Sequence, residues 1–565
     1  MFNRNYRKPA ALSLSVVLAG SALLAACGDN KEDAGTKPAD ATASASASAS
    51  AASAKPAGPK PKITVSIYDR NNVPEGEGTL TNNRWTKWIN ENAPVEVEFI
   101  PVPRTNSSEK WNVLFASGQA PDLIFEFSNP YMKELAGKGQ LMPLDDAIEK
   151  YSTTYKKLLK ENDLISKDTK LNGKTYFLGR PLALATNHYV MIRKDWLDKL
   201  NLPIPQTTED YLKVAKAFTD NDPDGNGKKD TLGSTFWDVD YFFGLGQSSL
   251  AAESAGPVTS YFIKNDEYVR QWEQPKAALA FKKALYDAGA VDKDIYTDKT
   301  GVKAQQDWVN GKLGIWGGSG LEGAAAYNVY DTLKKNNPDA QVVILPLPKS
   351  EFGQFSPAGG QPMQFTAAVN ATCKNVEAVI KYVDWMMQPD VSMTLAYGFE
   401  GVHYTKDPAT GFPKPIDAAK NKKELTWNAD FSMLANNTAL GKGLLYSNQL
   451  DASKPLDKEY LALIEQGRAA YLTPDRPYTI SVNLPTALPD DLLLISNTVT
   501  NTIVNIYTKA VVAGASYTAD QAIKDAQDAW EKAGGKKIDD FYAKVFKEQK
   551  ANLNFTKDYY KYLQK

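Results

Sequence analysis

The sequence predicts an α/β fold divided into two large lobes or several domains, and two observations carry this prediction. The chain has 565 residues, which is too long for one ordinary hydrophobic core. Early in the chain, segments of alternating hydrophobicity take turns with segments of helical periodicity, a pattern typical of a parallel sheet with helical crossovers. The composition, with 43% hydrophobic and 23% charged residues, is that of a soluble globular protein.

The alternation begins at residue 63 and defines the first elements in order. The predicted strands are residues 63–68, 95–102 and 121–127, and the helices between them are marked by Trp85, Trp88 and Ile89 and by Trp111, Leu114 and Phe115. Ligands of open α/β sheets bind beyond the carboxyl ends of strands. Asp69, Arg70, Arg104 and residues 126–129 follow such ends, so they are candidate ligand contacts. Each of them could equally cap a helix or form a surface ion pair.

Charge and rare residue types narrow the function. The 65 basic and 66 acidic residues give a net charge of −1, so no nucleic-acid partner is expected. The chain has two cysteines, Cys27 and Cys373, so we do not expect a framework of disulfide bonds to stabilise the fold. The two histidines, His188 and His403, leave little room for His-rich zinc sites or several His-dependent catalytic sites.

The N-terminus indicates export. A basic start precedes an apolar segment, Pro9 to Leu24, that is too short and interrupted for a membrane-spanning helix, so we predict a signal peptide over residues 1–26. The sequence LAAC, Leu24 to Cys27, resembles the lipobox of bacterial lipoproteins, which implies that Cys27 is lipidated and becomes the first mature residue. The alternative is an incidental cysteine. Residues 27–62 are small, polar and proline-rich, and we expect a disordered tether there.

Five segments, in this order and spacing, resemble the bacterial extracellular solute-binding proteins of family 1. They are residues 115–127, 137–151, 172–202, 309–318 and 397–405. These proteins are the capture components of ABC importers, mostly for sugars. The likeness is greatest to large lipoproteins of Gram-positive bacteria and to the calcium-carrying alginate-oligosaccharide-binding proteins.

The resemblance implies a two-lobed, periplasmic-binding-protein-like fold (type II) with a hinge-bending cleft between the lobes. We predict an N-terminal lobe of residues 63–186 and 366–435 and a C-terminal lobe of residues 187–365 and 436–565. In the first lobe, Asn375 is expected to cap a helix. The tail helices around residues 519–535 are expected to pack on the second lobe.

The segment DPDGNGKKDTLG, from Asp222 to Gly233, predicts a calcium loop. Its candidate ligands are Asp222, Asp224, Asn226, the backbone carbonyl of Lys228, and Asp230. The twelfth position is Gly233 and not the bidentate glutamate of an EF-hand, so a structural Ca²⁺ is expected and a sensor is not. In the alginate-binding relatives an acidic residue follows the last aspartate; here Thr231 stands there, which puts affinity and coordination number in doubt. The alternative is an Asx-rich turn.

A sugar site needs aromatic platforms and planar polar groups that bond two hydroxyls at once. We favour aromatic residues beside glycines or polar loop residues, because aromatic residues at helical spacing usually pack in cores. The candidate ligand contacts are Glu400, His403, Tyr404, Trp316, Trp237, Asp238, Tyr241, Asn187, Arg180, Asp69 and Trp427. A structural role is the alternative for each of them, above all for His403 and Trp427.

The expected function is therefore capture of an oligosaccharide by a monomer that is held to the cell membrane by its lipid alone and delivers its ligand to an ABC permease. A surface-anchored glycoside hydrolase is the alternative from another class, with Glu126 and Glu400 as nominal carboxylates. No hydrolase, phosphate-loop or zinc signature supports catalysis. A non-sugar solute such as a peptide is also an open alternative, and the residue types do not identify which sugar binds.

Overall fold

The structure of the protein is a computed structural model that describes residues 59–246, 261–298, 300–357, 363–408, 411–436, 438, 443–476, 484–555, 558 and 560. The predicted signal peptide, Cys27 and nearly all of the predicted tether lie outside these residues. Within the described ranges, no helix combines the length and the apolar character that crossing a membrane requires.

The first sheet has five strands in the order β2-β1-β3-β12-β6. These are β1 (Lys62–Asp69), β2 (Glu96–Pro103), β3 (Leu123–Phe125), β6 (Phe177–Pro181) and β12 (Met363–Val369). Strand β1 pairs in parallel with β2 and β3, as the sequence predicts, and β12 is antiparallel to both β3 and β6. Because β6 therefore runs in the direction of β1, the carboxyl ends of β1, β2, β3 and β6 share one edge of the sheet.

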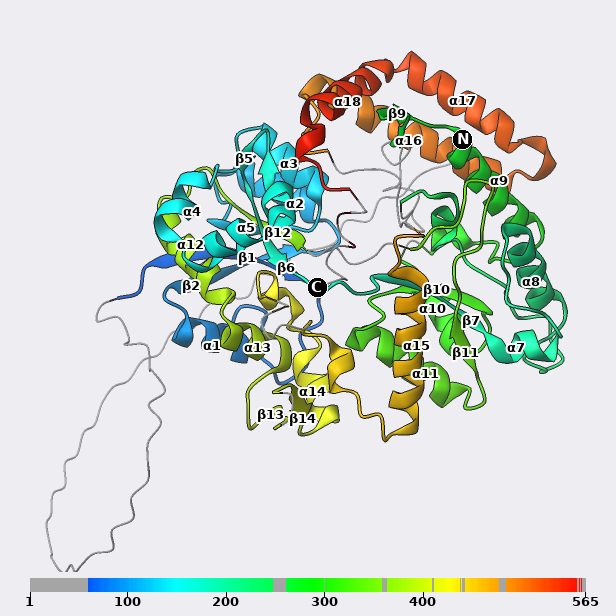
Figure 1. Ribbon diagram of the computed structural model, residues 1–565, viewed down its shortest axis with the longest axis horizontal. Coiled ribbons are helices and arrows are strands. Elements are labelled where there is room, and N and C mark those ends of the chain that lie inside the picture. The colour runs from blue at the N-terminus through cyan, green and yellow to red at the C-terminus, as the bar shows by residue number, and fades with distance from the viewer. Residues whose placement is uncertain are drawn as a thin grey trace, which may run out of the picture. The chain divides into compact units, whose positions relative to one another are not determined.

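Helices cover this sheet on both faces. Leu123 and Phe125 belong to one hydrophobic cluster and Ile124 to another, which places successive side chains of β3 in two cores. Helices α1 and α2 pack against β2, and α12 packs against β1 and α4 (Figure 1). The helices of this lobe are α1 (Arg84–Asn92), α2 (Ser107–Ala116), α3 (Asn129–Gly137), α4 (Asp145–Tyr151), α5 (Thr154–Glu161), α6 (Asp163–Asp168), α12 (Val376–Met386), α13 (Pro389–Tyr397) and α14 (Ala418–Leu425).

Local sequence explains where two of these helices begin. The side chain of Asn83 accepts hydrogen bonds from the backbone N–H groups of Trp85 and Thr86, which caps α1. Asn375 caps α12 in the same way through Ala378, as predicted. Trp85 and Trp111 are fully buried and anchor α1 and α2 to the sheet.

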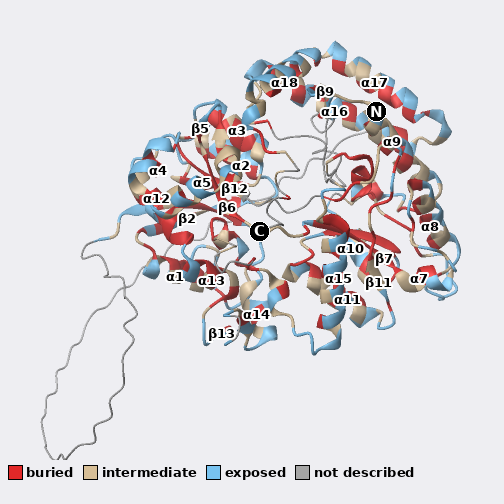
Figure 2. Ribbon diagram, viewed as in Figure 1, coloured by how far each residue is buried: buried red, intermediate tan, exposed pale blue. Residues whose placement is uncertain are grey.

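The second sheet has three antiparallel strands in the order β10-β7-β11. They are β7 (His188–Arg193), β10 (Ile315–Ser319) and β11 (Val342–Ile344). All six residues of β7 are buried, because it is the central strand. The surrounding helices are α7 (Lys194–Lys199), α8 (Thr208–Asp220), α9 (Glu273–Asp287), α10 (Val302–Val309), α11 (Ala324–Asn336) and α15 (Pro455–Tyr471). Figure 2 shows buried strands in both sheets and exposed outer faces on the helices.

The C-terminal helices extend the core of the second lobe. Helix α16 (Asp490–Val512) packs on α9 and on α17 (Ala519–Lys532), and α18 (Lys536–Gln549) packs on β9. Ala519 and Ala522 share one hydrophobic cluster with β7 and β10, so the predicted packing of the tail on the second lobe is confirmed. Small hairpins complete the fold: β4 (Lys170–Leu171) with β5 (Lys174–Thr175), β8 (Tyr261–Lys264) with β9 (Glu267–Arg270), and β13 (Tyr404–Lys406) with β14 (Pro413–Pro415).

Two sheets with separate cores confirm the predicted two-lobed α/β class. The chain returns to the first sheet at β12, after the strands of the second sheet are complete. The exact lobe boundaries at residues 186, 365 and 435 stay predictions.

Candidate functional site

Three arginines gather at the shared carboxyl edge of the first sheet. Arg70 directly follows β1, Arg104 directly follows β2, and Arg180 lies near the end of β6. We call Arg70, Arg104 and Arg180 the arginine cluster. The guanidinium carbons of Arg70 and Arg104 lie 5.9 and 5.0 Å from the ring centroid of Tyr68, so both side chains meet over one aromatic residue.

Arg70 is neutralised within the protein. Its Nε and Nη2 donate to the two carboxylate oxygens of Asp430 at 2.6 and 2.9 Å. Asp430 is buried in a 3-10 turn, η4 (Ala429–Ser432), that brings it to the strand edge. This bidentate ion pair is a strong, directional interaction. It leaves Arg70 few free N–H groups for the carboxylate of a ligand.

Arg104 lies over two aromatic rings and has no acidic partner among the described residues. Tyr68 and Phe127 stack with centroids 5.6 Å apart, and the guanidinium of Arg104 lies 5.0 and 5.4 Å from the two centroids. Its Nε is buried without a hydrogen-bond acceptor. The aromatic faces hold the cation in place but satisfy none of its N–H groups.

Within the described part of the chain, Arg180 has only neutral acceptors. Its Nη1 donates to the backbone oxygen of Ser432 at 3.1 Å and its Nη2 to Oε1 of Gln364 at 3.2 Å, whereas its buried Nε has no acceptor. Burial lowers the pKa of Arg180 to about 10, although the charge of Asp430 opposes this shift. The side chain therefore stays positive at neutral pH.

The two acidic candidates at the ends of β1 and β3 accept hydrogen bonds from N–H groups of the protein itself. Asp69 is exposed, and its Oδ1 accepts a hydrogen bond from Asn71 N at 2.9 Å. Glu126 is buried and accepts from Ser128 N at 2.7 Å and from Nε1 of Trp111 at 3.0 Å. Neither carboxylate forms an ion pair with Arg104 or Arg180 in the described part of the chain.

The predicted group Glu400, His403 and Tyr404 is only partly accessible. His403 is fully buried; its Nδ1 accepts from Phe399 N at 2.9 Å, and its Nε2 lies 2.9 Å from Oε2 of Glu424. Burial lowers the pKa of His403, and the hydrogen bond with Glu424 only partly offsets this. Both ring nitrogens are thus used inside the protein. Glu400 is exposed and pairs with Lys406 at 2.8 Å, while Tyr404 is buried.

Two predicted tryptophan platforms are packed in cores. Trp316, on β10, is 8% exposed and stacks on Trp308 with centroids 5.7 Å apart. Trp427 is 4% exposed and lies edge-on to Phe431. Their large rings fill the interiors of the two lobes, which limits what they can offer a ligand in this arrangement.

Trp237 and Asp238 place unsatisfied polar atoms beside β10. Both carboxylate oxygens of Asp238 and Nε1 of Trp237 are buried without partners in the described residues. Burial raises the pKa of Asp238 well above its ordinary value. A Cβ built on Gly317 would lie 1.5 Å from Oδ2 of Asp238, so this close approach requires glycine.

The remaining candidates of the second lobe flank β7. Tyr241 is buried with its ring 5.8 Å from that of His188. Asn187 is exposed directly before β7, and its backbone oxygen accepts from Gly320 N. Of the two, Asn187 alone presents its side chain to solvent.

The loop from Asp222 to Gly233 brings its predicted ligands together. Asn226 Nδ2 donates to Asp224 Oδ2 at 2.6 Å and to Asp230 Oδ1 at 3.0 Å, and Asn226 Oδ1 accepts from Lys228 N at 2.7 Å. Oδ1 of Asp222 is buried without a partner. Burial and a shared hydrogen bond with Asp222 raise the pKa of Asp224. Among the described side chains, no group of three or more His, Cys, Asp or Glu is arranged to hold a metal ion.

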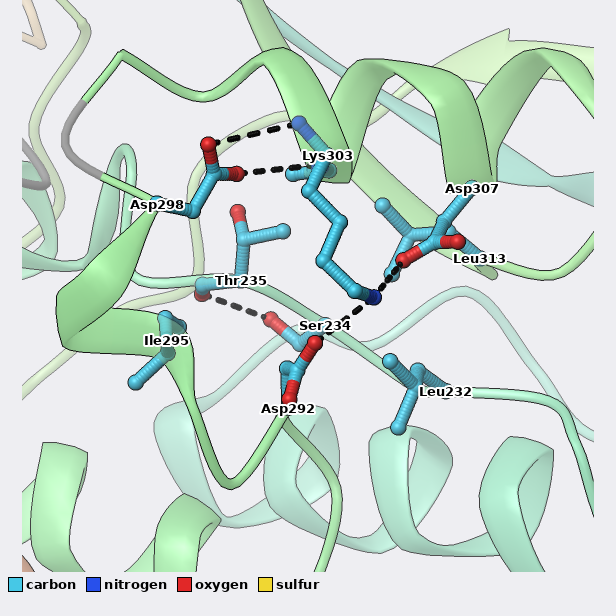
Figure 3. A pocket seen from close by; sticks show the side chains of 10 residues that line it. Leu232, Ser234, Thr235, Asp292, Ile295, Asp298, Lys303, Asp307 and Leu313 are labelled. Atoms are coloured by element: carbon cyan, nitrogen blue, oxygen red, sulfur yellow. Dashed lines mark hydrogen bonds and ion pairs between the residues drawn. The ribbon is translucent and has the colours of Figure 1, made fainter.

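A small pocket lies just beyond this loop, with Leu232 in its wall. Figure 3 shows Lys303 reaching between Asp292 and Asp307, with ion pairs of 2.7 and 2.6 Å, while Asp298 accepts from the backbone at the start of α10. Its volume of about 20 Å³ admits a water molecule and not a sugar ring. Lys303 forms ion pairs with Asp292 and Asp307, so we assign the pocket a structural role.

Sequence reasoning therefore named Arg180 and Asp69 as contacts but gave Arg70 and Arg104 no place among the leading candidates. The available signal was their position directly after predicted strands. What it lacked was the pairing of Arg70 with Asp430, which lies far away in the sequence.

Two sequence relatives come from Bacillus subtilis. The polygalacturonan/rhamnogalacturonan-binding protein YtcQ is 27% identical over 483 residues, covering 83% of this chain and 89% of that protein. Lipoprotein LipO is 27% identical over 318 residues, covering 55% of this chain and 61% of that protein.

Solved structures share the fold. The substrate-binding protein FusA of Streptococcus pneumoniae, in complex with kestose, is 19% identical with a TM-score of 0.66, covering 87% of this chain and all of that one. The alginate-binding protein AlgQ2, in a structure without calcium ion, is also 19% identical, with a TM-score of 0.64 and coverage of 86% and 98%.

The family described as bacterial extracellular solute-binding protein matches residues 82–393, more than half of the 565-residue chain. The match confirms the resemblance drawn from the five sequence segments. The protein belongs to this family of bacterial extracellular solute-binding proteins.

Proposed function

We propose that the protein captures an oligosaccharide outside the cell and delivers it to the permease of an ABC importer. The observation that carries this proposal is family membership together with a relative, matched over 89% of its length, that is named for binding polygalacturonan and rhamnogalacturonan. FusA, which shares the fold, is described in complex with kestose. No observation favours a peptide or another non-sugar solute.

The proposed mechanism is closure of the two lobes over the ligand. Each lobe has its own sheet and hydrophobic core, so each can move as a rigid body. A ligand that contacts both lobes stabilises the closed form by the difference of its affinity for the two forms. The permease then recognises the closed form.

The proposed ligand contacts are polar candidates that are either accessible or carry buried polar atoms without a partner among the described residues. In the first lobe these are the arginine cluster and Glu400, and in the second lobe they are Asn187, Trp237 and Asp238. Planar guanidinium, amide and carboxylate groups suit pairs of sugar hydroxyls. His403, Trp316 and Trp427 support the site by packing in this proposal, because the protein already uses their polar atoms or buries their faces.

We also propose that Ca²⁺ binds in the Asp222–Gly233 loop. The oxygens of Asp222, Asp224, Asn226 and Asp230, with the carbonyl of Lys228, would hold it, after the Asn226 amide turns its oxygen inward. The buried, unpartnered Oδ1 of Asp222 fits a cation there. The ion would hold together the loop that connects α8 to the core of the second lobe, which is a structural role.

The proposed location is the outer face of the cell membrane, through a lipid on Cys27. The lipobox-like sequence before Cys27 supports this, as does the similarity to lipoprotein LipO. We expect a monomer whose only membrane contact is the lipid, and a Gram-positive source.

Incubation with a panel of labelled oligosaccharides tests the proposal. Binding without catalysis predicts a raised melting temperature and unchanged sugar. Cleaved sugar would instead identify a glycoside hydrolase. A melting temperature that responds to no oligosaccharide, with Ca²⁺ supplied, would overturn the proposed function.

A further inference from the structure

We propose that Arg104 and Arg180 of the arginine cluster bind the carboxylate of an acidic sugar residue, so that the ligand is an anionic oligosaccharide. This inference rests on the proposed function and assigns the substrate class of the same site.

The edge is where this kind of sheet binds ligands. The carboxyl ends of β1, β2, β3 and β6 meet there, and each arginine lies at or directly beyond one of these ends. Three cations converging on one ligand edge are costly unless they have anionic partners. Among the described residues only Asp430 provides one, and it is bound to Arg70 through both oxygens.

Arg104 and Arg180 are therefore left without an ion pair in the described chain. The other acids at the edge, Asp69 and Glu126, accept hydrogen bonds from backbone or indole N–H groups instead. The Nε atoms of both arginines are buried and unsatisfied. Leaving such donors unmet destabilises the ligand-free protein, and an incoming carboxylate would satisfy them.

The geometry favours a carboxylate over a neutral hydroxyl. The guanidinium of Arg104 lies over both the Tyr68 and the Phe127 ring, and these contacts restrict the side chain, so it loses less entropy on binding. Arg104 is half-buried, and its terminal nitrogens form no hydrogen bond with any described residue. A planar guanidinium pairs with a carboxylate through two parallel hydrogen bonds.

The test compares trigalacturonate with its fully methyl-esterified form by titration calorimetry on the calcium-supplied protein. The ester keeps the sugar rings and removes the charge. Because charge-assisted hydrogen bonds are stronger than neutral ones, we expect the acid to bind roughly 10- to 100-fold more tightly than the ester, with an affinity that falls as salt rises.

Substitutions locate the effect. Arg104→Gln should remove most of the preference for the acid and leave ester affinity within about threefold, and Arg104→Lys should give an intermediate preference because the charge stays and the fork is lost. Arg476→Gln is the matched control: Arg476 is also half-buried, follows α15 on the other lobe, and among the described residues its side chain donates only to the Ala470 carbonyl. It should leave both affinities unchanged.

A variant that binds more tightly makes the test independent of misfolding, because a misfolded protein would lose affinity. Asp430→Asn removes the one carboxylate that competes for the cluster, and we expect it to raise acid affinity about three- to tenfold by freeing Arg70. Equal binding of acid and ester by the unmodified protein, or equal losses for both in Arg104→Gln, would overturn the inference. Binding of neutral oligosaccharides without the acid would overturn it alone, whereas no binding of any oligosaccharide would overturn the proposed function as well.

Discussion

The arginine cluster and the network around His403 use the same side-chain chemistry in one lobe, but only the second is complete within the protein. Glu424 bonds both His403 and Arg84, and Glu77 takes two further nitrogens of Arg84 at 2.8 Å. In the arginine cluster, by contrast, the guanidinium groups of Arg104 and Arg180 form no ion pair with any described residue.

This difference distinguishes the two clusters although their side-chain chemistry is the same. A network whose donors and acceptors are all satisfied gains nothing from a ligand, whereas unsatisfied buried donors gain a hydrogen bond each. We expect further effects, in decreasing order of size, at the calcium loop, Glu424, His403 and Glu400.

The calcium loop extends the comparison to oxygens, since Asp222 Oδ1 is buried and unsatisfied. Saturating Ca²⁺ should stabilise the protein by about 3 kcal/mol at a hundredfold excess over Kd. Thermal unfolding with Ca²⁺ and with a chelator measures this. Asp224→Ala should abolish the effect of Ca²⁺ on the melting temperature and have a far smaller effect on sugar affinity. If Ca²⁺ does not change the melting temperature of the unmodified protein, the calcium site is contradicted.

Breaking the complete network should cost stability and not affinity. Glu424→Ala leaves Nε2 of His403 buried without its partner, and we expect a loss of about 2 kcal/mol in unfolding free energy. Denaturant unfolding measures it, with Glu377→Ala as control. Glu377 pairs with Lys381 on an exposed surface, so its loss should stay below about 0.5 kcal/mol. A loss of sugar affinity in Glu424→Ala at full folding would contradict the comparison.

His403 should make stability depend on pH in one direction. Because its folded pKa is lowered, the unfolded chain binds a proton more readily, and stability falls as the pH drops below the unfolded value of about 6.5. Melting curves between about pH 5 and 8 should show this slope, and His403→Gln should flatten it. An unchanged slope in that variant would assign the titration elsewhere.

Glu400 gives the smallest expected effect on stability. Its pair with Lys406 is more than half exposed on both sides, so Glu400→Ala should change unfolding by less than about 0.5 kcal/mol. We expect weaker ligand binding without unfolding, measured by calorimetry beside Lys406→Ala. Equal affinity in Glu400→Ala would remove Glu400 from the site.

Local patterns predicted the first half of the N-terminal lobe well. Alternation predicted β1 and β2, because side chains of a strand point to opposite faces in turn, and β3 was predicted from the order of strands and helices. Asn375 was predicted as a cap from its position before an apolar helix. These features depend on neighbours in the sequence.

The site was harder to predict because burial and pairing depend on distant residues. Trp316 beside glycines suggests a platform, yet its stacking on Trp308 places it in the core. Whether His403 is free depends on Glu424, and whether Arg70 is free depends on Asp430. No local pattern contains these partners.

Capture of an oligosaccharide is tested most directly by titrating the calcium-supplied protein with acidic and neutral oligosaccharides of equal length in a calorimeter. We predict saturable one-to-one binding of at least one sugar, tightest for a uronate oligomer, with the sugar recovered intact. Heats that never saturate for any sugar in the set would contradict the account.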